Sequence, residues 1–149
     1  MITYYLESIF NPSEQNENII AEYIDRATQS IDICMYIFTS KFLAMKLLEK
    51  SQQGVKIRII ADQTEAYQTY SVVGALKETS DWDIQIRLVK KARLHNKFMI
   101  VDKLYLLIGS MNFSFKSKHN YENGSFFYGK ISSDYINQKI NNQICQICL

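Results

Sequence analysis

The chain has 149 residues, a length that fits one domain and allows about 70% of the unfolded surface to be buried. Hydrophobic residues make up 47% of it and there is a single proline, which is the composition of an ordinary soluble globular protein. The net charge of +2 is too small to indicate a nucleic-acid partner by itself. We therefore expect one globular domain over residues 1–149.

The apolar stretches, the first residues and the cysteines indicate where the protein is expected to function and whether it binds metal. No stretch approaches the roughly 18 consecutive apolar residues of a membrane-spanning helix, and the first residues, MITYYLESIFNPSE, lack the features of a secretory signal. A cytoplasmic protein is expected. Three cysteines do not indicate a disulfide framework. Cys145 and Cys148 form a C-x-x-C pair, but zinc would need two more ligands and only the distant Cys34 and His119 remain, so we expect buried thiols and no metal site.

Helical and extended patterns alternate along the chain. Ser13 is placed to cap a helix whose apolar stripe runs through residues 19, 20, 23, 24 and 27. Strands are predicted over residues 31–38, 55–61 and 84–89, and helices over 41–53 and, with a weaker pattern, 65–77. Near the end, a strand over 125–128 and a helix from about residue 133 are predicted. Strands separated by helices favour an α/β sheet that is covered by helices on both faces.

Between these elements, residues 98–101 and 104–108 form two short apolar runs around Asp102 and Lys103, which predicts a β-hairpin. With these two residues as the turn, Val101 lies opposite Leu104. Side chains alternate between faces, so this register places four polar residues on one face, at the end away from the turn: His95, Lys97, Ser110 and Asn112. The rest of that face is apolar: Met99, Val101, Leu104, Leu106 and Ile108.

The four polar residues have a common chemistry. A histidine is a nucleophile or proton carrier near neutral pH, and lysine, serine and asparagine side chains hold anionic oxygens. Such a group at the end of an apolar face is costly unless its members bind one another or a ligand. The alternative is an ordinary hairpin with a polar rim.

The stretch HNKFMIVDKLYLLIGSMN, residues 95–112, resembles the signature H-x-K-x4-D-x6-G-S-x-N of the phospholipase D superfamily. Every fixed position is matched, by His95, Lys97, Asp102, Gly109, Ser110 and Asn112. Residues 30–40, 54–62 and 120–123 also resemble the small single-motif members, the bacterial Nuc-like endonucleases and the mitochondrial Zucchini type. The resemblance implies a phospholipase D-like fold, a mixed β-sheet flanked by α-helices.

The resemblance also implies a two-step phosphodiester cleavage that needs no metal or cofactor. In the family, the motif histidine forms a phosphohistidine, and a second motif histidine protonates the leaving oxygen and then activates water. This chain has one motif, and its other histidine, His119, lacks the lysine and aspartate partners. The second histidine would therefore be His95 of another copy, in a two-fold homodimer with a shared active site.

Roles for single residues follow from the same resemblance. His95 would be the nucleophile in one subunit and the acid and base in the other. Lys97 and Asn112 would bind the nonbridging oxygens, with the Ser110 hydroxyl nearby. Glu122 matches the acidic residue that orients the histidine, and the alternative is a surface carboxylate. Asp102 and Gly109 are expected to serve the backbone, as a turn residue and at the strand end respectively.

Two basic clusters flank the motif, and they bear on the substrate. Both should lie near the polar end of the hairpin, where they could attract a polyanion or simply be solvated. The clusters are Lys90, Lys91 and Arg93, and Lys116 and Lys118. The expected function is a non-specific endonuclease that cleaves DNA or RNA. The alternatives are a phospholipase D or cardiolipin hydrolase and a catalytically idle nucleic-acid-binding dimer.

Overall fold

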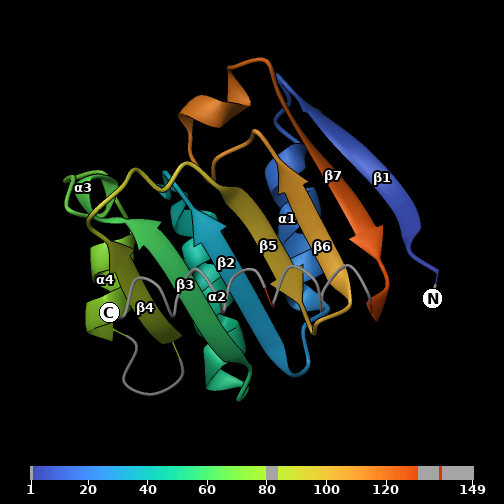
Figure 1. The fold of residues 1–149 in the computed structure, drawn as a ribbon, viewed down its shortest axis with the longest axis horizontal. Helices are drawn as coiled ribbons and strands as arrows, with labels where there is room; N and C mark the ends of the chain where they lie inside the picture. The colour runs from blue at the N-terminus through green and yellow to red at the C-terminus, as the bar shows by residue number, and fades with distance from the viewer. Residues whose placement is uncertain (1, 80–83, 131–137, 139–149) are drawn as a thin grey trace.

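The computed structural model of the chain describes residues 2–79, 84–130 and 138 (Figure 1). Its strands are β1 (Tyr4–Asn11), β2 (Ser30–Met35), β3 (Lys56–Asp62), β4 (Ile84–Val89), β5 (Lys97–Val101), β6 (Tyr105–Gly109) and β7 (Glu122–Tyr128). Its helices are α1 (Asn16–Asp25), α2 (Lys41–Gln52), α3 (Gln63–Ala66) and α4 (Val73–Thr79), and the 3-10 turn η1 spans Lys116–Lys118.

The strands form one seven-stranded sheet in the order β1-β7-β6-β5-β2-β3-β4. β2, β3 and β4 run parallel to one another, with helices between them in the chain. β5 pairs antiparallel with β2, and β6, β7 and β1 continue the antiparallel half. The sheet is therefore mixed, which confirms the predicted α/β fold class with a mixed sheet. β5, which begins with Lys97 of the motif, lies in the middle of this sheet and is buried along its whole length.

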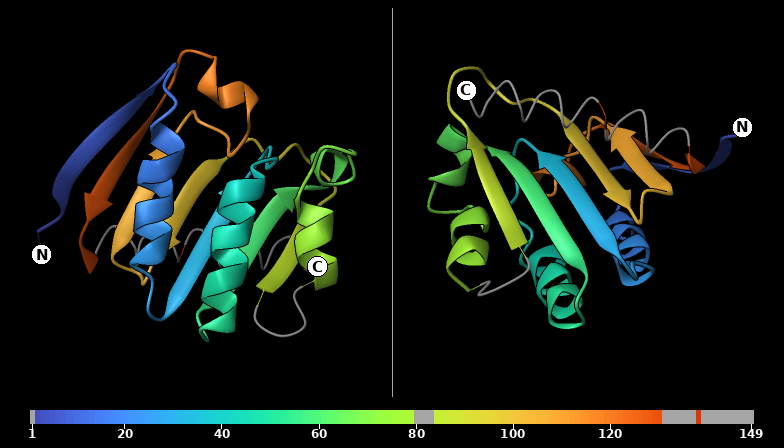
Figure 2. Two further views of the ribbon diagram at one scale, coloured as in Figure 1. Left: turned by 180° about the vertical axis from the view of Figure 1, so that it is seen from behind. Right: turned by 60° about the horizontal axis from the view of Figure 1, so that its bottom comes forward.

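The described helices α1, α2 and α4 pack on one face of the sheet (Figure 2). Helices were predicted on both faces, and the predicted last helix, from about residue 133, lies outside the described residues. The main core lies between the described helices and the sheet and includes Ile24, Ile31, Leu47, Ile57 and Phe126. The other face carries a second buried cluster made of Cys34, Ile60, Val89, Leu94, Phe98, Ile100 and Leu106.

The β5–β6 hairpin has a register one residue away from the predicted one. Val101 pairs with Tyr105 instead of Leu104, and the turn contains three residues instead of two. Asp102 and Lys103 have positive φ angles of 53° and 56°, a conformation that alternation of apolar residues cannot reveal. The predicted register was therefore wrong.

This change moves the side chains of β6 to the opposite face. Leu107 joins Met99 and Val101 in the main core, whereas Leu106 lies in the second cluster. The predicted common face, which grouped Leu106 and Ile108 with Met99, was wrong for the same reason. His95 precedes β5 and Ser110 follows β6, so strand alternation does not decide where either side chain points.

Several element predictions differ from the structure in detail. The N-terminal strand β1 was not predicted, and the expected helix over residues 65–77 is two short helices, α3 and α4. Ser13 does not cap α1. Its hydroxyl accepts a hydrogen bond from the backbone N–H of Gln15, and α1 begins after Gln15 without a side-chain cap. No helix of the described residues is long and apolar enough to cross a membrane.

Candidate active site

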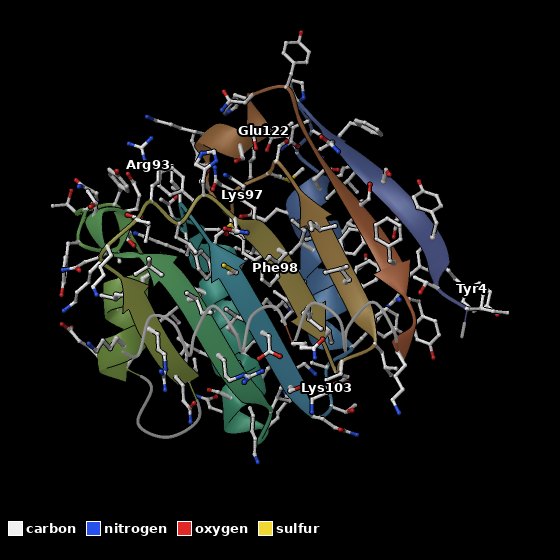
Figure 3. The ribbon with its side chains drawn as sticks, in the orientation of Figure 1. Tyr4, Arg93, Lys97, Phe98, Lys103 and Glu122 are labelled. Atoms are coloured by element: carbon white, nitrogen blue, oxygen red, sulfur yellow. The ribbon has the colours of Figure 1, made fainter. Side chains whose placement is uncertain are left out.

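Four of the motif residues, His95, Lys97, Ser110 and Asn112, lie at the end of the β5–β6 hairpin away from its turn. Figure 3 shows Arg93, Lys97 and Glu122 at this same end of the sheet, contributed by the segment before β5, by β5 itself and by the start of β7. The His95 side chain is exposed, and its ring centroid lies 4.8 Å from that of Tyr36. Within the described part of the chain, no side chain forms a hydrogen bond with the His95 imidazole, so its nitrogens are open to a substrate.

Lys97 is the buried cation of the site, with an exposed fraction of 8%. Its ammonium donates a hydrogen bond to the backbone oxygen of His95 and lies 5.3 Å from the centroid of the Tyr36 ring. Burial lowers the pKa of Lys97 below its usual value, and the negative charge of Glu122 partly offsets this effect. A positive charge with so little water around it interacts strongly with an incoming anion.

Asn112 presents the amino end of its side chain. Its amide oxygen accepts a hydrogen bond from the Ile37 backbone at 3.1 Å, which leaves the NH2 group as a donor for an anionic oxygen. The Asn112 backbone donates to the hydroxyl of Ser117, a buried residue of η1, at 3.1 Å. That hydroxyl also donates to Glu122 at 3.4 Å, so Ser117 connects two of the predicted site residues.

Glu122 does not form a hydrogen bond with His95 within the described chain. Its carboxylate accepts hydrogen bonds from Ser117 and, at 3.2 Å, from the side chain of Asn120. Its charge acts on Lys97, whose pKa it raises against the effect of burial. Glu122 therefore interacts with Ser117, Asn120 and the charge of Lys97 instead of with the imidazole.

Ser110 and Gly109 join the ends of β6 and β7. The Ser110 hydroxyl accepts a hydrogen bond from the Asn123 backbone at 3.0 Å, and the Ser110 backbone donates to the Asn123 carbonyl at 2.9 Å. A Cβ on Gly109 would lie 2.1 Å from that same carbonyl oxygen, so glycine is required by the close approach of β7. Ser110 is therefore at the rim of the site with its hydroxyl engaged by β7.

Asp102 lies in the hairpin turn, at the far end of β5 from His95. Its carboxylate accepts hydrogen bonds of 2.8–3.0 Å from the backbone of Thr28, Gln29 and Ser30 and from the Thr28 hydroxyl. Burial raises the pKa of Asp102, but these hydrogen bonds outweigh it and hold the pKa below its usual value. The motif aspartate thus fastens the hairpin turn to the start of β2.

The two basic clusters behave differently. Lys90, Lys91, Arg93 and Lys116 are exposed, whereas Lys118 forms an ion pair with Glu17 at 2.9 Å and a longer one with Glu14 at 3.8 Å. Lys118 is engaged within the chain, so its predicted substrate-binding role is not supported by this geometry. Arg93 lies close enough to Tyr36 for its charge to act on that phenol. The free cations of the site therefore come mainly from the segment before His95.

The remaining candidates for metal or proton chemistry are few. His119 is exposed at the end of η1, where its ring contacts Phe115. Burial raises the pKa of the Cys34 thiol to about 12, so it is protonated and inert near neutral pH. Cys145 and Cys148 lie outside the described residues. Among residues 2–79, 84–130 and 138, no group of three or more His, Cys, Asp or Glu side chains is arranged to hold a metal ion.

Sequence reasoning missed three residues that shape the site: Tyr36, Ser117 and Asp62. Each is far from the motif in sequence or outside its fixed positions, and each acts through a tertiary contact. Asp62, only 5% exposed, accepts a hydrogen bond from the Leu94 backbone at 3.0 Å and so fixes the residue before His95. The position of Asp62 at the end of a predicted strand was the one signal that could have pointed to it, since functional side chains often follow strand ends.

Among the described residues, the imidazole of His95 and the NH2 group of Asn112 have no hydrogen-bond partner, and the buried ammonium of Lys97 lies at the same end of the hairpin. Such a set of groups suits a class of proteins that handle phosphoryl groups. The chain belongs to the phospholipase D-like family: residues 20–145 match the family described as "Cardiolipin synthase, PLD-like domain". This match confirms the family resemblance that the motif predicted.

Two kinds of relatives share sequence with the chain. It is 40% identical over 91 residues to a mitochondrial cardiolipin hydrolase of Drosophila melanogaster, a match that covers 60% of this chain and 35% of that protein. It is 30% identical over 120 residues to a phospholipase D of Rickettsia felis, covering 79% of this chain and 58% of that protein. The matched part thus spans about a third to three fifths of the length of these relatives.

Solved structures resemble nearly the whole chain. NucT from Helicobacter pylori has a TM-score of 0.85 at 21% identity, and the match covers 96% of both chains. Nuc from Salmonella typhimurium, a phospholipase D family member, has a TM-score of 0.84 at 20% identity and covers 97% of this chain and 96% of its own. These likenesses show that the fold of the chain is that of the Nuc proteins.

Proposed function

We propose that the chain is a metal-independent phosphodiesterase, and specifically an endonuclease of low sequence specificity that cleaves DNA or RNA. The observation that carries the proposal is the exposed imidazole of His95 and the buried ammonium of Lys97, which both lie against the ring of Tyr36. One group can attack phosphorus while the other neutralises the phosphate, a task that a divalent metal performs in many other phosphodiesterases.

The reaction proceeds in two displacements on phosphorus. In the first, an imidazole nitrogen of His95 attacks phosphorus, the bond to the leaving alkoxide oxygen breaks, and the protonated His95 of a second copy supplies the proton. In the second, that now neutral imidazole takes a proton from water, the water oxygen attacks phosphorus, and the bond from phosphorus to the first His95 breaks. Lys97 and the NH2 group of Asn112 hold the nonbridging oxygens in both steps.

The nucleic-acid substrate is favoured by exposed cations in the segment before His95 and in η1. Nucleic acid carries a negative charge at every phosphate, and a row of exposed basic side chains attracts it without reading the bases. The residues that offer such charges are Lys90, Lys91, Arg93 and Lys116. Because these contacts go to the backbone, we expect cleavage with weak sequence preference.

Phospholipid hydrolysis is the second candidate, and specific observations favour it. The chain is 40% identical over 91 residues to a relative named as a cardiolipin hydrolase. Two aromatic side chains close to the site in sequence are strongly exposed, Phe115 at 67% and Tyr121 at 93%, and aromatic rings of this kind can enter a lipid interface. Both candidates use the same phosphodiester chemistry and differ in what the rim of the site binds.

The test is a cleavage assay in EDTA with plasmid, single-stranded DNA, RNA and cardiolipin vesicles, comparing wild type, His95→Ala and His119→Ala. We expect nucleic-acid cleavage by the wild type and by His119→Ala, because His119 stands outside the motif, and a loss of at least about 1000-fold for His95→Ala. Cleavage of cardiolipin alone would replace the endonuclease with the second candidate. A strict magnesium requirement, or full activity of His95→Ala, would refute the mechanism. Nucleic-acid binding without cleavage of any substrate would leave only an idle binding protein.

A further inference from the structure

Tyr36 is the one aromatic residue of the described chain in ring contact with His95. It follows directly after β2, whose last residue, Met35, pairs with Lys97 of β5. The ring of Tyr36 lies 4.8 Å from the imidazole, with 53° between the two planes, and the Lys97 ammonium lies 5.3 Å from the same ring. One side chain therefore touches both the proposed nucleophile and the proposed phosphate-binding cation.

The imidazole needs such a contact because nothing else in the described chain orients it. No side chain among the described residues forms a hydrogen bond with the ring, and Glu122 binds Ser117 and Asn120 instead. An exposed side chain without a fixed partner samples several rotamers, and a nucleophile misplaced by about 1 Å can lose on the order of 100-fold in rate. A flat ring against the imidazole restricts that freedom.

Tyr36 is itself fixed from behind by an acidic residue of α3. Its hydroxyl donates to Glu65 at 3.3 Å, and the second carboxylate oxygen of Glu65 accepts from Tyr70 at 2.9 Å. The Glu65 backbone in turn donates to Asp62 at 3.2 Å, and the other oxygen of Asp62 holds the Leu94 backbone. The same buried carboxylate thus anchors both the residue before His95 and the residue that binds Tyr36.

We propose that Tyr36 is a positioning residue of the phosphoryl-transfer site, whose ring holds the His95 imidazole in its attacking orientation and keeps the Lys97 ammonium beside it. This inference rests on the proposed role of His95 as the nucleophile. The ring provides the effect, and the hydroxyl only anchors the ring to Glu65. Tyr36→Phe should therefore preserve the function that Tyr36→Leu removes.

The experiment compares kcat and KM of Tyr36→Phe, Tyr36→Leu and Tyr70→Leu with the wild type on bis(p-nitrophenyl) phosphate, a substrate too small to need the basic rim. Tyr70 is the matched control because its hydroxyl binds the same carboxylate of Glu65. We expect kcat to fall about 10- to 100-fold in Tyr36→Leu with KM changed less than about threefold, and both other variants to stay within about threefold of wild type. Equal activity of Tyr36→Leu and wild type would overturn the proposal, as would equal losses in the Phe and Leu variants.

A second measurement separates this inference from the proposed function. The NMR signals of the His95 ring carbons, assigned through His95→Ala, report the ring contact whether or not the protein is active. We expect them to keep their positions in Tyr36→Phe and to move in Tyr36→Leu, because the ring current of residue 36 is lost. Unmoved signals in Tyr36→Leu would refute the contact itself. Full activity of His95→Ala on the small substrate would instead refute His95 as the nucleophile. The NMR comparison would still test whether the ring of Tyr36 contacts the His95 imidazole.

Discussion

Asp102 is a motif residue that contacts the segment leading into β2 and has a structural role in the fold. Four hydrogen bonds from residues 28–30 converge on its carboxylate, and they lie at the opposite end of β5 from His95. A carboxylate that accepts several backbone hydrogen bonds is stabilised in its charged form. The presence of this aspartate in the motif is thus explained by the need to fix the hairpin that carries the other motif residues.

Asp102→Asn should therefore destabilise the protein without removing the site. We expect a loss of about 1–3 kcal/mol in the free energy of unfolding at pH 7, because the amide offers one acceptor oxygen and sets an NH2 group against backbone donors. Urea denaturation monitored by circular dichroism measures it. Asp25→Asn is the control, since its partner Lys46 lies at the surface and an exposed ion pair of this kind contributes little to stability.

The same variant gives a pH test with a defined sign. The folded-state pKa of Asp102 lies below its ordinary value of 3.8, so the carboxylate contributes stability above that pH and loses it as the pH falls through the folded-state pKa. The stability difference between wild type and Asp102→Asn should be constant near neutral pH and shrink below about pH 4. A difference that grows on acidification would contradict the assignment.

At the scale of elements, the end of β6 depends on one close contact between strands. Gly109 pairs with Gly124 of β7, and an added Cβ at Gly109 would lie 2.1 Å from the Asn123 carbonyl oxygen. This contact involves backbone atoms, so a side chain cannot be accommodated by a rotamer change. The two strands would have to separate at the point where Ser110 leads into Asn112.

Gly109→Ala should cost about 1–3 kcal/mol of stability and lower activity together with it, because strand separation displaces the site residues that follow β6. Thermal and urea unfolding measure the first effect and phosphodiester cleavage the second. Gly74→Ala is the matched control: a Cβ at Gly74, in α4, meets nothing within 4 Å, and alanine there should add about 0.5–1 kcal/mol. A Gly109→Ala protein as stable as the wild type would show that β7 can move away from β6 without loss of stability.

The sequence largely predicted which helices and strands form, but it did not predict the register of the hairpin or where a helix is interrupted. Apolar periodicity located β2, β3, β4 and α2 within a few residues, because buried strands and an amphipathic helix leave a local pattern. It missed β1, an edge strand with an exposed first half, and it read α3 and α4 as one helix. The hairpin register failed because the turn holds three residues instead of two, a length that the alternation of apolar residues does not record.

In the site, too, the features set by local sequence were predictable and the contacts between distant segments were not. The spacing of the motif placed His95, Lys97, Ser110 and Asn112 at one end of the hairpin, and this location does not depend on the exact register. The contacts of Tyr36 with His95 and of Ser117 with Glu122 come from segments brought together by the sheet order. Such contacts become visible only when the strand order is known.

At the scale of the whole molecule, one copy of the chain supplies one motif histidine. The described chain places His119, the other histidine, beside Phe115 and not beside His95, so it offers no second imidazole for the leaving group. A two-step displacement needs a nucleophile and a separate proton carrier at the same phosphorus. A second copy related by two-fold symmetry would supply the missing imidazole from the same surface.

Mixed dimers test this arrangement directly. Wild type and His95→Ala are refolded together in equal amounts, and cleavage is compared with wild type alone at the same total concentration. If both histidines serve one site, only dimers with two wild-type chains cleave, and activity should fall to about one quarter because random pairing makes that fraction of dimers. An activity of about one half would mean that each chain works alone, and a monomer in light scattering would agree with it. Mixing wild type with His119→Ala should leave full activity, which would show that refolding by itself does not reduce activity.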